Sequence, residues 1–379
     1  MAGPLTGVRV VELSGRGPAP FGGMILSDLG ADVARVARPE TAPASAESGT
    51  EKMIAGRRRI DPVTRGRREV AADLKDTGGL AAVLRLIDRA DVLIEGYRPG
   101  VAERLGLGPD ECLRRNPRLI YARMTGWGQD GPYAQVPGHD INYVALTGAL
   151  DALRRGPQEP PAPPLNLLGD YGGGGMLLVV GILAALVERS ASGRGQVVDA
   201  AMTDGVALLT TLLHGMRAEG LWNPAPGTNV LDLGAPFYNV YETADGRHVT
   251  IGCGEPKFYA SLLSQLGFPA GERADLLRGQ ALPETWPEGK KRLAAAFRGK
   301  TFAQWRELLE GTDTCFAPVL TLGEAPEHPH LKARGTFVTV DGVTQPAPAP
   351  RFSRTAPSVP TAADEGRTGI EDLLRDWGA

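Results

Sequence analysis

The chain has 379 residues, of which 42% are hydrophobic and 22% charged, and its formal net charge at pH 7 is −3. This composition is typical of a soluble globular protein with two domains, and it gives no electrostatic case for binding nucleic acid or an anionic membrane. The three cysteines, Cys112, Cys253 and Cys315, form neither a zinc-ligand pattern nor an obvious disulfide framework. The N-terminal sequence has no basic segment followed by an apolar one, so a cytoplasmic protein is expected.

Short apolar runs alternate with helical patterns over the first 200 residues. Strands are expected at residues 7–13, 31–36, 70–74, 91–95, 119–124 and 196–198. Helices are expected at residues 20–29 and 79–89, and a long helix should follow the last strand through about His214. This alternation predicts an α/β fold with a mostly parallel sheet covered by helices.

The first strand–helix–strand unit resembles a dinucleotide site only in part. Gly15 and Gly17 fit the first two glycines of the G-x-G-x-x-G pattern, but Pro20 occupies the third place. The second strand is followed by Arg38 and not by an acid that could bind a ribose. A nicotinamide site is therefore disfavoured, whereas Arg38 would suit a phosphate.

Further arginines lie in two places. Residues 40–69 are small and polar and contain Gly-Arg-Arg runs at 56–58 and 66–68, which predicts a mobile basic loop or, alternatively, an ordinary solvated surface segment. Arg98 and Arg104 follow the expected strand at 91–95, at the edge where open α/β sheets bind ligands.

His139 and Asp170 are two proton-handling side chains that each lie beside glycine. Asp140 is expected to cap the N-terminus of a helix. The four glycines at 172–175 are expected to adopt positive φ and to come close to a ligand. The twelve-residue apolar run at 176–187 is too short to span a bilayer, so it predicts a buried helix whose N-terminus faces Asp170.

The second half of the chain indicates a smaller domain at residues 236–325, reached through a crossing segment. The features expected there and beyond are a hairpin at 237–252, a helix opened by Glu255, a capping box at 301–304, a Pro-rich strap at 345–360 and a closing helix at 370–377.

Several long runs, in one order, carry a resemblance to a known family. They read LTGVRVVEL with LSDLGADVARV, VAADLKD, DVLIEGYRPGVAERLGLGP, YARMTGWGQDGPY, GHDINY, LNLLGDYGGGGM and GRGQVVDAAMTDG. With these runs the chain resembles the class III CoA-transferase superfamily, and within it the branch of racemases that act on 2-methylacyl-CoA thioesters. The resemblance implies a Rossmann-like large domain at 1–200 and 330–379, a crossing linker at 201–235, and the smaller α+β domain. It also implies two chains threaded through each other as an interlocked homodimer with a shared active site.

The resemblance also implies roles for individual residues. His139 and Asp170 would be the two acid/base residues, and Glu255 the carboxylate paired with the histidine. The CoA contacts that it implies are Arg38, Ala72, Leu74, Lys75, Arg98 and Arg104. The segment between Arg38 and Ala72 is longer than is usual in the family, which leaves open which of its arginines reach the CoA phosphates. No metal and no separate cofactor is expected, because CoA is part of the substrate.

The chemistry of these side chains suits inversion of the carbon next to a thioester carbonyl. One group removes the α-proton to give an enolate, and a second returns a proton from the opposite face. An unperturbed histidine side chain exchanges protons near neutral pH, and burial would raise the pKa of Asp170 toward that range. Glu255 would support the charged imidazole, and the backbone N–H groups at His139 and Asp140 would face the enolate oxygen.

Other interpretations stay open. A class III CoA-transferase would use Asp170 as a nucleophile that forms a mixed anhydride, although such enzymes commonly carry tyrosine in the place of His139. A non-catalytic acyl-CoA binding protein would keep the arginines and glycines without needing the three acid/base side chains. Glu255 could be only a helix cap, and Asp170 only a turn residue. The remaining histidines, which have no acid partner at a recognisable spacing, are expected to be structural or exposed: His214, His248, His328 and His330.

Overall fold

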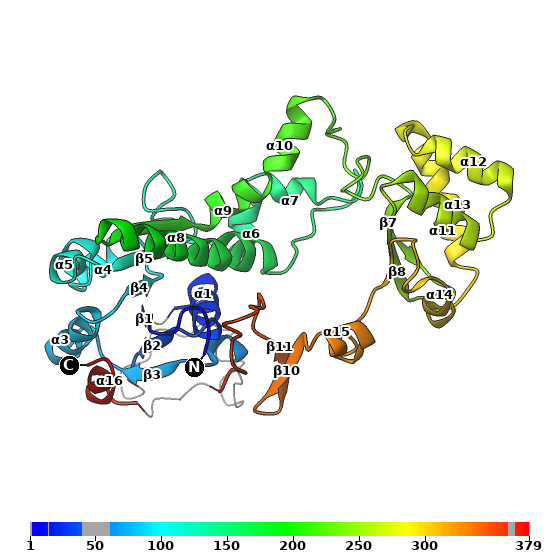
Figure 1. Ribbon diagram of the computed structural model, residues 1–379. Helices are drawn as coiled ribbons and strands as arrows, with labels where there is room; N and C mark the ends of the chain where they lie inside the picture. The colour runs from blue at the N-terminus through cyan, green and yellow to red at the C-terminus, as the bar shows by residue number, and fades with distance from the viewer. Residues whose placement is uncertain (1, 14, 40–60, 363–367, 379) are drawn as a thin grey trace. The chain divides into compact units, whose positions relative to one another are not determined.

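A computed structural model describes residues 2–13, 15–39, 61–362 and 368–378 (Figure 1). The chain divides into two compact units. The first unit comprises residues 1–147, 164–209 and 329–379, and the second comprises residues 148–163 and 210–328. The second unit is therefore an insertion within the sequence of the first.

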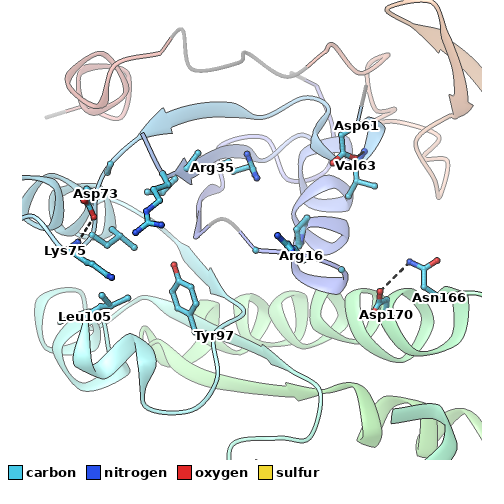
Figure 2. A pocket seen from close by; sticks show the side chains of 18 of the residues that line it. Arg16, Arg35, Asp61, Val63, Asp73, Lys75, Tyr97, Leu105, Asn166 and Asp170 are labelled. Carbon is cyan, nitrogen blue, oxygen red and sulfur yellow. Dashed lines mark hydrogen bonds between the residues drawn. The ribbon is translucent and has the colours of Figure 1, made fainter. Parts of the chain in front are cut away.

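Six strands in the described part of the first unit form one parallel sheet. They are β1 (Arg9–Leu13), β2 (Asp32–Ala37), β3 (Arg68–Ala71), β4 (Val92–Glu95), β5 (Ile120–Thr125) and β6 (Gln196–Ala201). Their order in the sheet is β3-β2-β1-β4-β5-β6, and every neighbouring pair is parallel. This is the strand order of the Rossmann fold, so the predicted helix-covered parallel sheet is confirmed. Residues just after β3 and β4, among them Asp73 and Tyr97, lie around one cavity (Figure 2).

Helices and a hairpin complete the first unit. They are α1 (Pro18–Asp28), η1 (Pro62–Thr64), α3 (Thr77–Ile87), α4 (Val101–Arg104), α5 (Pro109–Arg115), α6 (Asp140–Leu146), η2 (Leu167–Met176), α8 (Leu177–Ser192), α9 (Met202–Leu209), α15 (Pro329–Ala333), the hairpin of β10 (Phe337–Val340) and β11 (Val343–Pro346), and α16 (Ile370–Asp376). The single long helix expected to run through His214 is interrupted at Thr210, after which α10 begins in the second unit.

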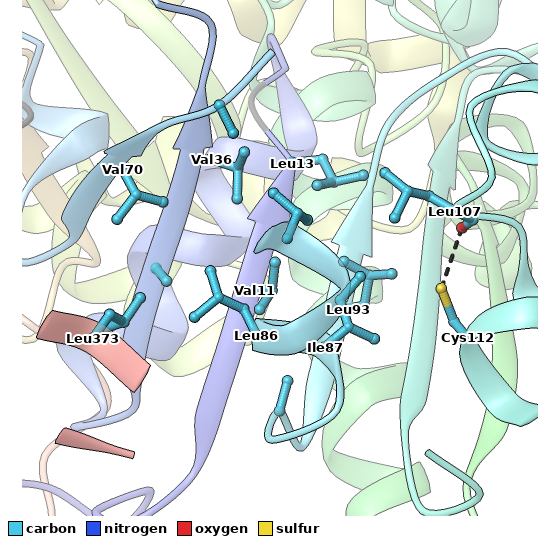
Figure 3. Packing of buried hydrophobic residues seen from close by; sticks show 14 of the residues in the cluster. Val11, Leu13, Val36, Val70, Leu86, Ile87, Leu93, Leu107, Cys112 and Leu373 are labelled. Carbon is cyan, nitrogen blue, oxygen red and sulfur yellow. Dashed lines mark hydrogen bonds between the residues drawn. The ribbon is translucent and has the colours of Figure 1, made fainter. Parts of the chain in front are cut away.

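The sheet separates two apolar cores because successive strand residues point to opposite faces. On one face Val11, Leu13 and Leu93 pack with residues of α3 and α5 (Figure 3). On the other face Val10 and Val92 pack with α1 and α8. The expected closing helix is present as α16, whose buried Leu373 and Leu374 join the first of these cores, and the Trp377 indole N–H donates to the Asp32 carboxylate at 2.8 Å.

The prediction of a mobile or solvated basic segment is wrong for the second Gly-Arg-Arg run, residues 66–68. Arg67 is buried and forms an ion pair with Glu12 at the end of β1, and Arg65 is buried against Asp28, with 3.0 Å between its Nε and the carboxylate. Arg68 begins β3. These arginines fix the chain to α1 and β1, because a buried guanidinium needs a carboxylate partner. The first Gly-Arg-Arg run, 56–58, lies outside the described residues.

The prediction for the four glycines is also wrong. Residues 172–175 lie inside the π-helix η2, which continues into α8, and none of them has positive φ. A Cβ on Gly174 would come within 2.8 Å of the Pro18 side chain, and one on Gly173 within 2.7 Å of the Val206 N–H nitrogen. The glycines therefore serve close packing of η2 against α1 and α9.

The helical segment after Asp170 is longer and less buried than expected. η2 and α8 form 26 continuous helical residues, Leu167–Ser192, with a mean hydropathy of 1.7, which is long and apolar enough to cross a membrane by length and composition. Leu178, Ile182 and Ala185 are buried in the core of the first unit, whereas Met176 and Val187 are exposed. Packing on the sheet thus explains the apolar character of one side of this helix only.

The second unit combines a small sheet with helices. Its sheet has the order β7-β8-β9, formed by β7 (Tyr238–Glu242), β8 (His248–Gly252) and β9 (Phe316–Pro318), all antiparallel. Its helices are α7 (Ala149–Ala152), α10 (Thr211–Ala218), α11 (Pro256–Gln265), α12 (Ala270–Gly279), η3 (Pro283–Thr285), α13 (Trp286–Phe297), α14 (Phe302–Leu309) and η4 (Ala325–Glu327). The predicted hairpin and the Thr301–Gln304 capping box are both confirmed.

Candidate active site

The larger cavity of the first unit lies at the carboxyl edge of its sheet. It has a volume of about 770 Å³ and is lined by residues that follow β1, β2, β3 and β4 (Figure 2). Four of the predicted CoA contacts line it: Arg38, Ala72, Leu74 and Lys75. With Arg16 they give the cavity three cationic side chains that are exposed, a setting that suits the phosphates of a nucleotide.

Arg35 also lines this cavity, but its guanidinium is engaged by a carboxylate. It forms an ion pair with Glu69, and its Nε lies 4.0 Å from the Glu12 carboxylate. Arg35 therefore belongs as much to the buried charge network beneath the cavity as to the cavity itself.

A second cavity of about 260 Å³ adjoins the first. The two share Arg16, Gly17, Tyr97 and Asp170 among their lining residues. The second cavity also contains His139, so the structure brings His139 and Asp170 to one cavity. Arg98 lines this smaller cavity and not the larger one, and Arg104 lines neither of them.

His139, and not Asp140, is the N-cap of α6. His139 has extended backbone angles, and its N–H donates to the Asn142 side-chain oxygen at 3.0 Å. The prediction failed because both residues precede the apolar positions of the helix, and aspartate is a commoner N-cap residue than histidine. The cap position leaves the His139 imidazole exposed at the mouth of the cavity.

The Asp140 carboxylate is used for a different contact. It is buried, and its Oδ2 accepts a hydrogen bond from the Asp170 backbone N–H at 2.6 Å. Gly169 carries no Cβ, which leaves the space that the Asp140 carboxylate occupies. Within the described part of the chain, the buried Asp140 Oδ1 has no hydrogen-bond partner. Through this hydrogen bond Asp140, the residue that follows His139, holds the backbone of Asp170 in place.

The Asp170 carboxyl is half-buried in the first turn of η2. Its Oδ2 accepts a hydrogen bond from the Asn166 side chain at 3.4 Å, and a Cβ on Gly17 would come within 3.1 Å of it. Burial raises the pKa of Asp170, and the nearby Asp140 carboxylate also raises it, whereas the hydrogen bond from Asn166 and the proximity of His139 act in the opposite direction. The net direction is upward, toward the range in which a carboxyl group exchanges protons near neutral pH.

Glu255 lies in the second unit as the N-cap of α11. Its side chain is exposed, and it makes no hydrogen bond to the helix that follows. Glu255 therefore occupies the helix-cap position that the sequence allowed, but its carboxylate does not make the capping hydrogen bond. The pairing of Glu255 with His139 stays a prediction.

Sequence reasoning missed several cavity residues and one histidine contact. Arg16, Tyr97 and Tyr171 line the larger cavity. The same edge rule that pointed to Arg98 could have found Arg16 and Tyr97, since each closely follows a strand. His328, which was expected to be structural or exposed, contacts the Glu310 carboxylate, a partner 18 residues away that no spacing rule indicated. Among the described residues, no group of three His, Cys, Asp or Glu side chains is placed to hold a metal ion.

The fold and these two cavities define a doubly wound α/β protein with a cationic cavity beside a histidine–aspartate site. The chain belongs to CoA-transferase family III, which it matches over residues 5–366. It is 47% identical over 378 residues to alpha-methylacyl-CoA racemase of Mus musculus, covering 99% of this chain and 93% of that protein. It is 43% identical over 377 residues to alpha-methylacyl-CoA racemase of Homo sapiens, with the same two coverages of 99% and 93%.

More distant members of the family act in other ways or have known structures. Acetyl-CoA:oxalate CoA-transferase of Acetobacter aceti is 31% identical over 361 residues, which are 91% of this chain and 88% of that protein. The crystal structure of a CAIB/BAIF family protein from Brucella suis superposes with a TM-score of 0.77 at 26% identity, covering 99% of this chain and 100% of that one. The same overall fold is thus found in a solved member of the family.

Proposed function

We propose that this chain is a racemase that inverts the α-carbon of 2-methylacyl-CoA thioesters. The observation that carries the proposal is the presence of His139 and Asp170 in one cavity that adjoins a larger cationic cavity. The identity to racemases of mouse and man, over 99% of the chain, supports the same reaction.

In the proposed reaction, one of the two side chains removes the α-proton and the other returns a proton from the opposite face. Burial raises the pKa of Asp170, which favours its protonated form and supports a role in proton transfer. We assign the Asp140 backbone N–H, in the first turn of α6, to the enolate oxygen, because the first N–H groups of a helix have no intrahelical acceptor. Glu255 is assigned to the imidazolium form of His139.

The larger cavity is assigned to the CoA moiety. Arg38 and Lys75 would bind its phosphates, and Arg16 is added to this set from its place in the cavity. Arg98, in the smaller cavity, would bind nearer the thioester. Arg104 lines neither cavity, so its assignment rests on the family resemblance alone.

We further propose that the protein is an interlocked homodimer, whose second chain covers an apolar face of the first unit. The large hydrophobic side chains of η2, α8 and α9 that are at least 50% exposed are Leu167, Met176, Val180, Val187, Leu208 and Leu209. Soluble monomers seldom expose so many apolar side chains on neighbouring elements, and a second chain would bury them. In such a dimer the Glu255 of one chain would serve the His139 of the other.

Co-expression of two inactive variants tests this shared site. In randomly paired His139→Ala and Glu255→Ala chains, about half of the dimers are mixed, and one of the two sites in each mixed dimer is intact. About a quarter of wild-type activity should therefore return. A site built within one chain would regain nothing in verified heterodimers, and that result would overturn the shared site without affecting the racemase proposal.

The reaction itself is tested in D₂O with a single enantiomer of a 2-methylacyl-CoA. A racemase incorporates deuterium at the α-carbon and approaches an equal mixture of epimers without any acid acceptor. Substrate that reacts only after a carboxylic acid is added would sink the racemase proposal.

The family itself favours one alternative, CoA transfer through a mixed anhydride on Asp170. Hydroxylamine added with acyl-CoA would then cleave the anhydride and convert Asp170 to its hydroxamate. A proton-transfer role predicts that no adduct forms, so the same incubation distinguishes the two reactions.

A further inference from the structure

Two of the three cysteines lie close together in the second unit. Cys253 directly follows β8 and Cys315 directly precedes β9, and the two strands pair antiparallel with Ile251 opposite Phe316. The Gly252 N–H donates to the Cys315 carbonyl at 3.0 Å, so both cysteines lie at the same end of this strand pair. Their separation in the sequence gave no sign of this proximity.

The two thiols differ in exposure but interact with each other. The Cys253 side chain is buried, and its Sγ donates to the carbonyl of Thr314, the residue before Cys315, at 3.0 Å. Cys315 is exposed and has a φ of 46°. Burial, and then the adjacent Cys315 thiol, raises the pKa of Cys253 to about 12. The third cysteine, Cys112, is buried in the first unit and donates to the Leu107 carbonyl.

We propose that Cys253 and Cys315 form a dithiol site that low-molecular-weight disulfides of the glutathione type oxidise reversibly to an intrachain disulfide, which moves the backbone that carries Glu255. The formation of the disulfide stands on the geometry of the two cysteines. Its effect on turnover rests on the proposed function, because only that function gives Glu255 a part in the reaction.

The oxidation proceeds by two thiol–disulfide exchanges. The exposed Cys315 loses its thiol proton to solvent, attacks one sulfur of the oxidant and displaces the other half as a thiolate, which takes up a proton. Cys253 then loses its proton and attacks the Cys315 sulfur of the mixed disulfide, which releases the second half of the oxidant. Two protein thiols are oxidised to one disulfide, and one small disulfide is reduced to two thiols. Exposure makes Cys315 the point of entry. Cys253 is the resolving thiol because it lies beside Cys315, and its raised pKa makes the second exchange the slower one.

Formation of the disulfide would displace the backbone of Glu255, which lies two residues after Cys253. The Gln280 side chain donates to the carbonyls of Cys253 and Gly254, at 3.0 and 2.9 Å, and holds this short segment in place. A disulfide would draw the Cys253 sulfur from the Thr314 carbonyl toward Cys315. No atom beyond its chain neighbours lies within 4 Å of the position that a Cβ on Gly254 would take, so side-chain packing does not restrain the chain there. The displacement is therefore passed to the cap of α11.

Mass spectrometry of the full-length protein tests the site directly. The native protein is incubated with glutathione disulfide, quenched with an alkylating agent and digested. The expected product is a Cys253–Cys315 linked peptide, with Cys112 alkylated only after unfolding. Cys253→Ser should stop at a glutathione adduct on Cys315, and Cys315→Ser should take no glutathione. A wild-type protein that stays reduced, or that stops at the adduct, would overturn the proposal.

Activity and hydrogen exchange test the consequence. Oxidation should lower the kcat for α-proton exchange by about tenfold or more, as small displacements of positioning groups do, and dithiothreitol should restore it. Cys315→Ser should have wild-type kcat and be insensitive to the oxidant. Cys112→Ser should have wild-type kcat when reduced and should lose activity on oxidation as the wild type does. Amide exchange over residues 252–260 should change on oxidation, and this readout holds even if the reduced protein has no racemase activity. Oxidised protein with unchanged exchange and unchanged kcat would overturn the effect on Glu255.

Discussion

Two carboxylates, the buried Glu12 and the half-buried Asp170, lie against helix α1 or its cap and have different partners. Glu12 occupies the space left by Gly23, and Asp170 lies against Gly17. Burial is the largest influence on both groups and raises the pKa of each. In both places the absence of a side chain on α1 lets a carboxyl group approach the helix backbone.

The partners decide what each acid can do. Glu12 is fully buried and forms an ion pair with Arg67, which is itself almost fully buried. Asp170 opens onto two cavities and, within the described part of the chain, forms no ion pair with lysine or arginine; its neighbours are Asn166, Asp140 and His139. A buried acid with an arginine partner is a structural link, whereas one that faces a cavity without such a partner is able to exchange its proton.

The largest expected effect is on Asp170. Asp170→Asn should fold, yet turnover should fall by about 10³-fold or more, because an amide cannot relay a proton. The rate of deuterium incorporation into a 2-methylacyl-CoA measures this. Glu12→Gln is the matched control and should leave kcat near that of the wild type in protein that has remained folded. If Asp170→Asn kept most of its turnover, the contrast between the two acids would fail.

The largest effect on the free energy of unfolding is expected at the Glu12–Arg67 pair. Arg67→Ala leaves Glu12 buried without its cation, so the free energy of unfolding should fall by about 3–5 kcal/mol. Urea denaturation measures the loss. Arg114, which pairs with Glu111 on the surface, provides the control, and Arg114→Ala should cost less than about 1 kcal/mol. Equal losses for the two arginines would show that the buried pair is not a structural link.

A smaller effect is expected at Asp140. Asp140→Ala removes the acceptor of the Asp170 N–H and should lower kcat about tenfold, with a lesser change in KM. Asp140→Asn keeps an acceptor oxygen and should restore much of the kcat. Because the Asp140 charge raises the pKa of Asp170, both variants should move the acid limb of the kcat/KM profile to lower pH. A limb that stays in place would mean that Asp140 has no influence on Asp170.

The smallest effect concerns the pH dependence of stability. The pKa of Asp170 is raised in the folded protein above its ordinary value of 3.8, so the folded state binds more protons than the unfolded state just above that pH. Stability is therefore lost as the pH rises through this window. Asp170→Asn removes that loss and should be more stable than the wild type at neutral pH but not below pH 3.8. Unfolding titrations at both pH values measure the difference, and a gap of equal size at each would contradict the raised pKa.

The sheet could be predicted because its information is local. The β-branched runs around Val11 and Val92 and the Thr301 capping box each fix an element within a few residues. Resemblance to a family then pointed to His139 and Asp170, which no local pattern could have paired across thirty intervening positions.

The failures share a physical cause, since each depends on partners far along the chain. Arg67 looks like a surface residue until Glu12 supplies its counter-charge. The glycines at 172–175 look like a flexible turn until α1 and α9 come within contact of them. Asp140 looks like a cap, and its carboxylate instead holds the backbone of Asp170. A sequence pattern reports the conformation that a segment prefers in isolation. The structure of these segments depends instead on the residues that pack against them.

The discontinuity of the first unit bears on how the polypeptide is made. The apolar face formed by Val11, Leu93 and α3 includes Leu373 and Leu374, which are synthesised more than 270 residues after β4. The second unit, residues 148–163 and 210–328, leaves the ribosome in the meantime and has its own core around Tyr259 and Trp305. The nascent chain must therefore carry an incomplete hydrophobic core until α16 emerges, and transiently exposed apolar surface of this kind is prone to aggregation.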